Sequence, residues 1–277
     1  MNQEPPNASP AEQRTRRNIV KMGVILASAG IATARMAHAQ TISTSATASY
    51  PGGGFGGWGG KCFLRGTSIR TVEGERKIED LVSGDLLPTH FGGVRPIRWI
   101  ARYPLKKSDP SKPWVKDVRP VRIARSALAT GVPHDDLYVT GEHALFIDGL
   151  LIPVGNLING TTITRLEARE CDELEYFNIN FDGHDVIYAE GAPVETLRDV
   201  DESAVNFAEY YRKYGIPRTQ ETRCAPYISF GGSRGELKSR VRSAISPWLD
   251  RREQIDVIRD RLEERGIALS RQLEPSF

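Results

Sequence analysis

The sequence is poor in several features that define large classes of proteins. Its three cysteines in 277 residues are too few for a scaffold held together by disulfides. The net charge is only +2 at pH 7, and charges of both signs are mixed, so neither a nucleic-acid footprint nor an acidic tail is indicated. The apolar run from Met22 to Ala34 is too short to span a membrane. Hydrophobic residues still make up 39% of the chain, which is enough to bury a core.

Residues 1–39 have the pattern of an export signal. The stretch from Thr15 to Lys21 contains two adjacent arginines and resembles the twin-arginine motif. An apolar run with Arg35 behind it follows, and Ala37-His38-Ala39 is a small-residue cleavage pattern. We therefore predict export by a twin-arginine-type route, which makes the protein periplasmic or secreted. The alternative is an uncleaved signal that tethers the protein to the membrane.

Residues 40–61 are rich first in Ser and Thr and then in Gly. A segment of this composition cannot bury enough apolar surface to offset its backbone entropy, so we predict a flexible leader. The leader ends at the peptide bond between Lys61 and Cys62, and it brings that bond to the start of a folded domain.

Residues 62–198 have the pattern of an all-β domain. Alternating polar and apolar residues predict short strands, and Gly, Asp and Ser mark the turns between them. Strands are predicted at Ser68 to Val72, from Leu86, at Ile97 to Ala101, Val118 to Ile123, Asp136 to Thr140 and Ala144 to Ile147, and on both sides of a tight turn at Asp182-Gly183. Short strands with turns at this rate favour an all-β fold.

Three blocks in this domain contain candidate reactive residues. The first, Lys61 to Thr89, begins with Cys62 ahead of a strand and continues through two turns. The second is Thr140-Gly141-Glu142-His143, at a break in an apolar strand, where two polar groups can point into one pocket. The third runs from Tyr176 to Gly191 and has His184 directly after its Asp-Gly turn. In this order the blocks resemble the Hint superfamily, the autoprocessing domains shared by inteins and Hedgehog proteins.

The resemblance implies a horseshoe-like, pseudo-twofold, all-β domain that cleaves the Lys61–Cys62 bond. Cys62 would attack the carbonyl of Lys61 and replace the amide by a thioester. His143 would protonate the departing nitrogen, Thr140 would stabilise the oxyanion, and His184 would be a second proton carrier. Water, a thiol or an amine would then release the leader, which is the protein's own substrate. No cofactor is implied, and no short Cys/His spacing supports a metal site made of Cys62, His143 and His184.

Two positions depart from the intein pattern. Splicing needs a terminal Asn, but the matching place holds Val194-Glu195-Thr196, so splicing is not expected. The strand position where relatives carry an acid holds Asn178, which cannot act as a base. Both departures favour a competing hypothesis, a degenerate domain that serves as a structural or interaction module. A third hypothesis is a cysteine hydrolase that acts on other proteins, but the sequence reveals no substrate cleft for it.

The two cysteines outside these blocks leave two alternatives open. Cys171 and Cys224 could form a disulfide in an oxidising compartment, which would leave Cys62 as the remaining thiol. Alternatively, both stay reduced and buried if folding precedes export.

Residues 199–277 change to helical periodicity. Apolar residues at helical spacing predict a helix over residues 204–214 that ends at Gly215. A second helix is predicted to begin at Ser246-Pro247 and to end at Gly266. These helices either pack on the β domain as cover or bind a partner, in the place where Hedgehog relatives carry a lipid-recognition region.

Overall fold

The computed structural model describes residues 60–107, 109–217, 223–228 and 254–273. The predicted export signal, the leader up to residue 59 and the predicted helix start at Ser246-Pro247 lie outside these ranges. Within these ranges, no helix combines the length and the apolarity that a membrane crossing requires. Export and a flexible leader therefore stay predictions.

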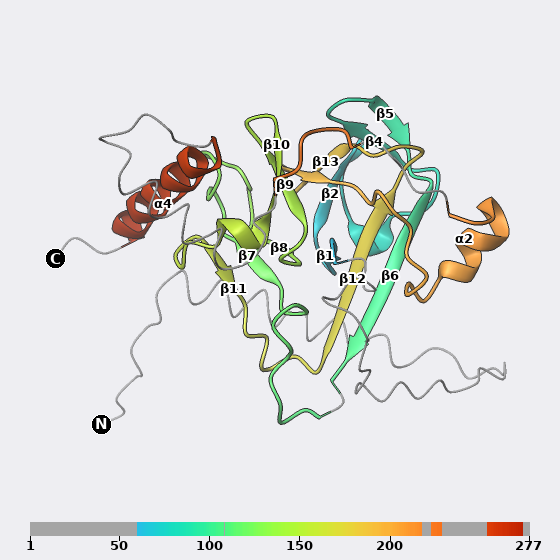
Figure 1. Ribbon diagram of the computed structural model, residues 1–277, viewed down its shortest axis with the longest axis horizontal. Coiled ribbons are helices and arrows are strands. Elements are labelled where there is room, and N and C mark those ends of the chain that lie inside the picture. Colours follow the sequence, from blue (N-terminus) through green and yellow to red (C-terminus); the bar gives the residue numbers. More distant parts are fainter. Residues whose placement is uncertain (1–59, 108, 218–222, 229–253, 274–277) are drawn as a thin grey trace, which may run out of the picture. The chain divides into compact units, whose positions relative to one another are not determined.

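The described part of the chain is mainly β, as predicted (Figure 1). Its strands are β1 (Phe63–Leu64), β2 (Ser68–Thr71), β3 (Gly74–Lys77), β4 (Leu86–Thr89), β5 (Gly93–Pro96), β6 (Trp99–Lys106), β7 (Val121–Ile123), β8 (Leu137–Val139), β9 (Ala144–Ile147), β10 (Leu150–Pro153), β11 (Ile163–Arg165), β12 (Glu173–Asn180), β13 (Val186–Ala189) and β14 (Ala192–Glu195). The helices are η1 (Ile78–Asp80), η2 (Val154–Leu157), α2 (Phe207–Tyr214) and α4 (Gln254–Leu273). The predicted all-β domain with a helical C-terminal extension is confirmed.

Two six-stranded sheets contain most of the strands. The first sheet has the order β11-β7-β8-β1-β12-β6, and the second has the order β10-β9-β14-β13-β2-β3. The neighbours in both sheets are antiparallel, and β4 and β5 form a separate hairpin. Because β1 lies between β8 and β12, the chain is enclosed by other strands as soon as it passes Cys62.

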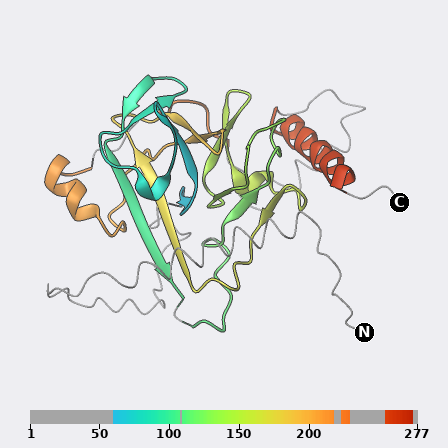
Figure 2. The same cartoon turned by 180° about the vertical axis from the view of Figure 1, so that it is seen from behind.

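The long strands β6 and β12 show why the sequence forms this sheet. In β6, Trp99, Ala101 and Tyr103 are buried and the residues between them are more exposed, which is the period of a strand with one covered face. β12 pairs with β6 along its whole length, and the two strands lie side by side in Figures 1 and 2. The residues of the second half of β12 are buried on both faces, and β1 pairs with its other edge.

One hydrophobic cluster joins the two large sheets. Phe63 and Phe177 enter it from the first sheet, and Leu145 and Ile187 enter it from the second. All four side chains are almost completely buried, and burial of each such side chain contributes about 1.5–3 kcal/mol. The cluster therefore fixes one sheet against the other.

The chain crosses from the first sheet to the second at residues 65–67, 140–143 and 181–185. The last crossing shows that the hairpin predicted at Asp182-Gly183 is wrong, because β12 and β13 belong to different sheets. Gly183 has a φ of 121°, which side chains rarely allow. This conformation turns the chain into the other sheet rather than back along its own ladder. Each crossing lies within one of the three candidate blocks.

Helix α2 begins at Phe207 rather than at residue 204, and it ends at Gly215 as predicted. The late start has a local cause in the side chain of Asn206. Its oxygen accepts from the N–H of Arg102 at 3.1 Å, and its nitrogen donates to the carbonyl of Ile100 at 2.8 Å. These bonds tie the chain to β6 before the helix begins, as Asn side chains do when they compete with helical hydrogen bonds. Gly215, with a φ of 74°, then ends the helix.

Helix α4 continues to Leu273, so the end predicted at Gly266 is wrong. A Cβ at Gly266 would lie 2.4 Å from Oγ1 of Thr161, so this glycine allows a close approach between the helix and the loop after η2. Ile258 and Leu262 of the same helix belong to the hydrophobic cluster of the β domain. Helix α4 therefore packs on the β domain as cover.

Candidate active site

Strand register places Cys62 between two polar residues. The next residue, Phe63, pairs in antiparallel register with the last residue of β8 on one side and with a residue of β12 on the other. The position before Phe63 therefore lies opposite Thr140, which follows β8, and opposite Asn178 of β12. Cys62 is only 2% exposed, so these two residues are direct neighbours of its backbone in a closed environment.

Thr140 contacts the nitrogen side of the bond between Lys61 and Cys62. Its Oγ1 accepts a hydrogen bond from the N–H of Cys62 at 2.9 Å, and its hydroxyl donates to the carbonyl of Gly60. Its own N–H donates to the carbonyl of Cys62 at 2.9 Å. The sequence suggested that Thr140 donates to the oxyanion, but its hydroxyl proton is directed to Gly60.

Asn178 contacts the carbonyl side of the same bond. Its Nδ2 donates to the carbonyl oxygen of Lys61. Its Oδ1 accepts from the N–H of Ile179 at 2.7 Å, and the side chain is fully buried, so the amide is held with its NH2 group toward that oxygen. Asn178 cannot be a base, but it stands where an oxyanion would need a donor.

His143 lies in the crossing between β8 and β9, against the ring of Phe63 at 4.3 Å between centroids. Its Nε2 is 2.9 Å from the carbonyl oxygen of Glu195, which accepts from Nε2–H, and Nδ1 has no hydrogen-bond partner among the described residues. Burial lowers the pKa of the imidazole, and the Glu195 carboxylate and the backbone of Cys62 offset this only in part. A neutral ring whose Nδ1 lies near the backbone of Cys62 but meets no donor in the described part of the chain is the form that can accept a proton.

The thiol of Cys62 is in the protonated form at neutral pH. Burial raises its pKa well above the ordinary value, and the nearby charge of Asp201 raises it further. Burial also raises the pKa of Tyr103 and Tyr176, and the neighbouring Cys62 adds to both shifts. A cysteine among buried phenols and near a carboxylate needs a base to become a nucleophile.

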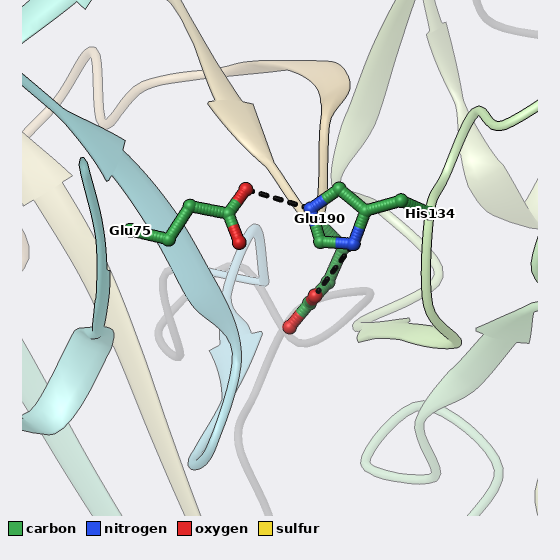
Figure 3. A group of neighbouring side chains, drawn as sticks. All are labelled: Glu75, His134 and Glu190. Atoms are coloured by element: carbon green, nitrogen blue, oxygen red, sulfur yellow. Dashed lines mark hydrogen bonds and ion pairs between the residues drawn. The ribbon is translucent and has the colours of Figure 1, made fainter.

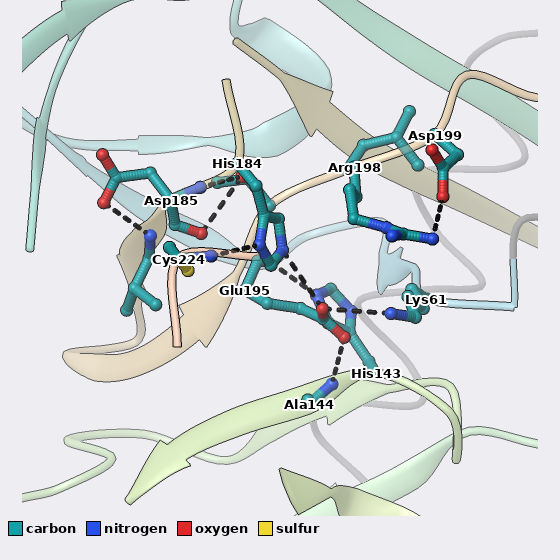
Figure 4. A network of polar contacts seen from close by, with 12 residues as sticks. Lys61, His143, Ala144, His184, Asp185, Glu195, Arg198, Asp199 and Cys224 are labelled. Atoms are coloured by element: carbon teal, nitrogen blue, oxygen red, sulfur yellow. Dashed lines mark hydrogen bonds and ion pairs between the residues drawn. The ribbon is translucent and has the colours of Figure 1, made fainter. Parts of the chain in front are cut away.

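Glu195 is a site residue to which sequence reasoning assigned no role. It ends β14 with its carboxylate fully buried, and Oε2 lies 3.1 Å from Nζ of Lys61 (Figure 4). Oε1 accepts from the N–H of Ala144 at 2.9 Å. Burial alone would raise the pKa of this carboxyl, but the contact with His184 and the charge of Lys61 hold it below its ordinary value. The signal was a carboxylate ending a strand of otherwise apolar residues, since buried charges are paired.

His184 reaches the bond through Glu195. Its Nε2 lies 3.3 Å from Oε2 of Glu195, and its Nδ1 accepts from the N–H of Cys224 at 3.2 Å (Figure 4). The bond from Cys224 makes Nδ1 an acceptor, so the ring faces the carboxylate with Nε2, which makes an ion-pair contact there but no hydrogen bond among the described residues. The structure thus brings Cys62, Thr140 and His143 together, whereas His184 is separated from them by Glu195.

A second polar cluster, away from this bond, contains Glu75, His134 and Glu190 (Figure 3). Their ligand atoms lie within 4.8 Å of one another, so the group could hold a metal ion. However, Nε2 of His134 is 2.6 Å from Glu75, while Nδ1 is 3.6 Å from Glu190. One ion cannot bind both nitrogens of one ring. The arrangement fits an imidazole that bridges two carboxylates and connects the β2–β3 hairpin to the β13–β14 turn.

Cys171 and Cys224 are both thiols, so of the two alternatives the structure has the reduced pair. Burial raises the pKa of Cys171 and raises that of Cys224 to about 11. Neither thiol is ionised at neutral pH, and Cys224 contributes to the site through its backbone N–H.

Comparison with known proteins gives one sequence match and several structural ones. The profile of the Hint domain matches residues 61–201, and no curated protein matches the chain. The gp41-1 intein is 15% identical, with a TM-score of 0.34, over 48% of this chain and 97% of that one. A DnaB intein from Synechocystis sp. PCC 6803 is 12% identical, with a TM-score of 0.34, over 49% and 97%. A bacterial intein-like domain from Clostridium thermocellum is 16% identical, with a TM-score of 0.33, over 50% and 98%.

Proposed function

The chain belongs to the Hint domain family, and on this premise we propose that it cleaves its own Lys61–Cys62 bond through a thioester, without splicing. The leader before Cys62 is the substrate, and the reaction uses no cofactor. The observation that carries the proposal is the set of contacts on one peptide bond. Thr140 binds its nitrogen and Asn178 binds its carbonyl oxygen, while His143, whose ring lies next to the backbone of Cys62, is the base that we assign.

In the first step, the thiol of Cys62 gives its proton to Nδ1 of His143, and Sγ attacks the carbonyl carbon of Lys61. The C=O electron pair moves to the oxygen, where Nδ2 of Asn178 stabilises it. The tetrahedral intermediate then collapses with cleavage of the C–N bond, and His143 returns the proton to the nitrogen of Cys62. The product is a thioester on the sulfur and an amine on the same residue, with no net change in protons.

In the second step, water, a thiol or an amine attacks the thioester carbon. The C–S bond breaks, the proton of the nucleophile goes to the sulfur, and the leader is released as an acid, a thioester or an amide. His184 and Glu195 form the second proton-carrying pair, because their contact at 3.3 Å lies next to the side chain of Lys61. Each molecule reacts once.

We further propose that residues 1–39 export the protein by a twin-arginine-type route to the periplasm or the medium. Such cargo folds before it crosses the membrane, so cleavage would begin in the cytoplasm. The alternative is an uncleaved signal that tethers the leader to the membrane, in which case self-cleavage would release the domain from it.

One observation favours a second candidate function. The thiol of Cys62 is buried and its pKa is raised, which disfavours the thiolate. If the reaction never starts, the same contacts preserve the bond, and the chain is a degenerate Hint domain that serves as a structural or interaction module.

Intact-mass spectrometry of the full chain, freshly purified and then incubated with and without added thiol, tests the proposal. We expect a species that begins at Cys62 and grows with time, faster with thiol, because a thiol attacks thioesters readily. Cys62→Ala should keep the full mass, whereas the matched control Cys171→Ala should cleave like the parent protein. An unchanged mass in the folded parent protein under both conditions would overturn self-cleavage and leave the structural module.

A further inference from the structure

The side chain of Lys61 is held by Glu195, within the range of the Hint match, and by Tyr227, from the segment after it. Its Nζ lies 3.1 Å from Oε2 of Glu195, and it stands 4.8 Å from the centroid of the Tyr227 ring. The lysine side chain is only 24% exposed, and the carboxylate that faces it is fully buried. A lysine in a solvated linker would keep its ammonium group in water, so this position is bound.

We propose that Glu195 and Tyr227 form a subsite that selects a lysine side chain immediately before the cleaved bond. The proposal rests on the self-cleavage proposed above and names the sequence that it accepts. The carboxylate supplies the charge and the ring supplies a π face, which together suit an ammonium group on a long apolar stem.

Tyr227 comes from a segment outside the shared domain. Residues 223–228 follow the 61–201 range of the Hint profile. Tyr227 forms a parallel bridge with Leu151 of β10, whose N–H donates to the carbonyl of Pro226 at 2.8 Å and whose carbonyl accepts from the N–H of Ile228 at 2.9 Å. The segment therefore extends the second sheet beyond its edge strand β10, and it brings Tyr227 to Lys61 from outside the range that the Hint profile matches.

The same segment contacts both ends of the buried ion cluster, which consists of His184, Glu195 and Lys61. The N–H of Cys224 holds Nδ1 of His184, and the ring of Tyr227 covers Nζ of Lys61, with Arg223 against the same ring at 4.1 Å. Glu195 lies between them and needs compensating positive charge because it is buried. Lys61 supplies this charge from the leader, so binding of its side chain also positions its carbonyl against Asn178.

Cleavage rates of four proteins test the subsite: the parent chain, Lys61→Met, Tyr227→Leu and the double variant. Methionine keeps the stem of Lys61 without its charge, and we expect cleavage to slow about tenfold or more, since leaving Glu195 without its cation is costly. Tyr227→Leu should slow cleavage about threefold to thirtyfold. In the Lys61→Met background the same change should have little further effect, because the two residues act on each other. Equal rates for the parent chain and Lys61→Met, or effects that simply multiply, would overturn the subsite.

A second measurement keeps the subsite separate from the cleavage. In a Cys62→Ala background the leader stays attached, and acetylation of lysines is followed by peptide mass spectrometry. Lys61 should react about fivefold more slowly than the exposed Lys112, and Tyr227→Leu should reduce that protection. Protection of Lys61 in this background, together with a parent chain that never cleaves, would refute self-cleavage and support the subsite. Cleavage in the parent chain with an unprotected Lys61 would support self-cleavage and refute the subsite.

Discussion

The two sides of the Lys61–Cys62 bond have opposite electrostatic surroundings. On the carbonyl side, Lys61 joins a buried ion cluster with Glu195, and a fixed amide already donates to the carbonyl oxygen. On the sulfur side, Cys62 is enclosed among buried phenols, and burial raises the pKa of its thiol. The electrophile is thus prepared while the nucleophile stays protonated.

The difference teaches where the barrier of the proposed reaction lies. Binding of the carbonyl is complete in the structure, so it costs nothing further when the reaction begins. Formation of the thiolate has to be driven by a base, and we assign His143, whose ring packs against Phe63 and lies near the backbone of Cys62. The rate should therefore depend most on the proton acceptor, then on the donor to the oxygen, and least on the charges that keep the site folded.

The largest effect is expected from His143→Gln, which removes the proton acceptor on the sulfur side of the bond. Glutamine cannot accept the thiol proton, so cleavage should slow about 10²–10⁴-fold. Thiol-induced cleavage followed by intact mass measures this, with His90→Gln as the matched control on the exposed β4–β5 hairpin. A His143→Gln variant that cleaves at the parent rate would contradict the assignment of the base.

A smaller loss is expected from Asn178→Ala, which removes the donor on the carbonyl side. Loss of one such donor costs about 10²–10³-fold in rate. Asn178→Asp sharpens the test, because a carboxylate cannot donate to the oxyanion and would repel it. We expect Asn178→Asp to be slow as well. If it cleaved faster than the parent protein, the position would be suited to a base, and the donor role would be wrong.

The smallest effect concerns stability in acid, measured as the urea midpoint of Cys62→Ala from pH 7.5 down to about pH 2.5, which passes below the ordinary pKa of both groups. The pKa of His143 and that of Glu195 lie below their ordinary values in the folded protein. Their stabilisation is complete above about pH 6.5 and about pH 4.3, respectively, and is lost as the pH falls through each folded value. We expect a loss on the order of 1–3 kcal/mol.

His143→Gln in the same background separates the two contributions. It should remove the part of the acid-induced loss of stability that begins near pH 6.5. The part at lower pH, which depends on Glu195, should remain. A urea midpoint that rises as the pH falls would contradict both pKa directions.

Much of the fold was predictable because local patterns decide it. Alternation in β6 and the glycine that ends α2 follow from residues close in sequence, and the order of the three blocks pointed to Cys62 and His143. The predicted hairpin at Asp182-Gly183 was wrong because a turn sequence does not say which sheet the next strand joins. Gly266 was taken for a helix end because the nearby loop that requires a glycine is distant in sequence.

The unpredicted part of the site depends on register and on distant segments. Asn178 was interpreted as the loss of an acid, and its role as a donor becomes visible only when β1 is paired with β12. Glu195 meets Lys61 across 134 positions of sequence. Tyr227 joins through a parallel bridge to β10, for which no local pattern exists. Pairing across the sheets, rather than residue type, creates these contacts.

The hydrogen bond between Thr140 and the nitrogen of Cys62 has a consequence for the end state of the proposed reaction. After the bond is cleaved, the nitrogen of Cys62 is an amine that can still donate to Oγ1 of Thr140. The acyl group is then on the sulfur of the same residue. No contact among the described residues moves it away, so transfer of the acyl group back to this nitrogen competes with release of the leader. The domain would then hold the amide and the thioester in equilibrium. The concentration of an external nucleophile, more than the protein itself, would decide how much leader is released.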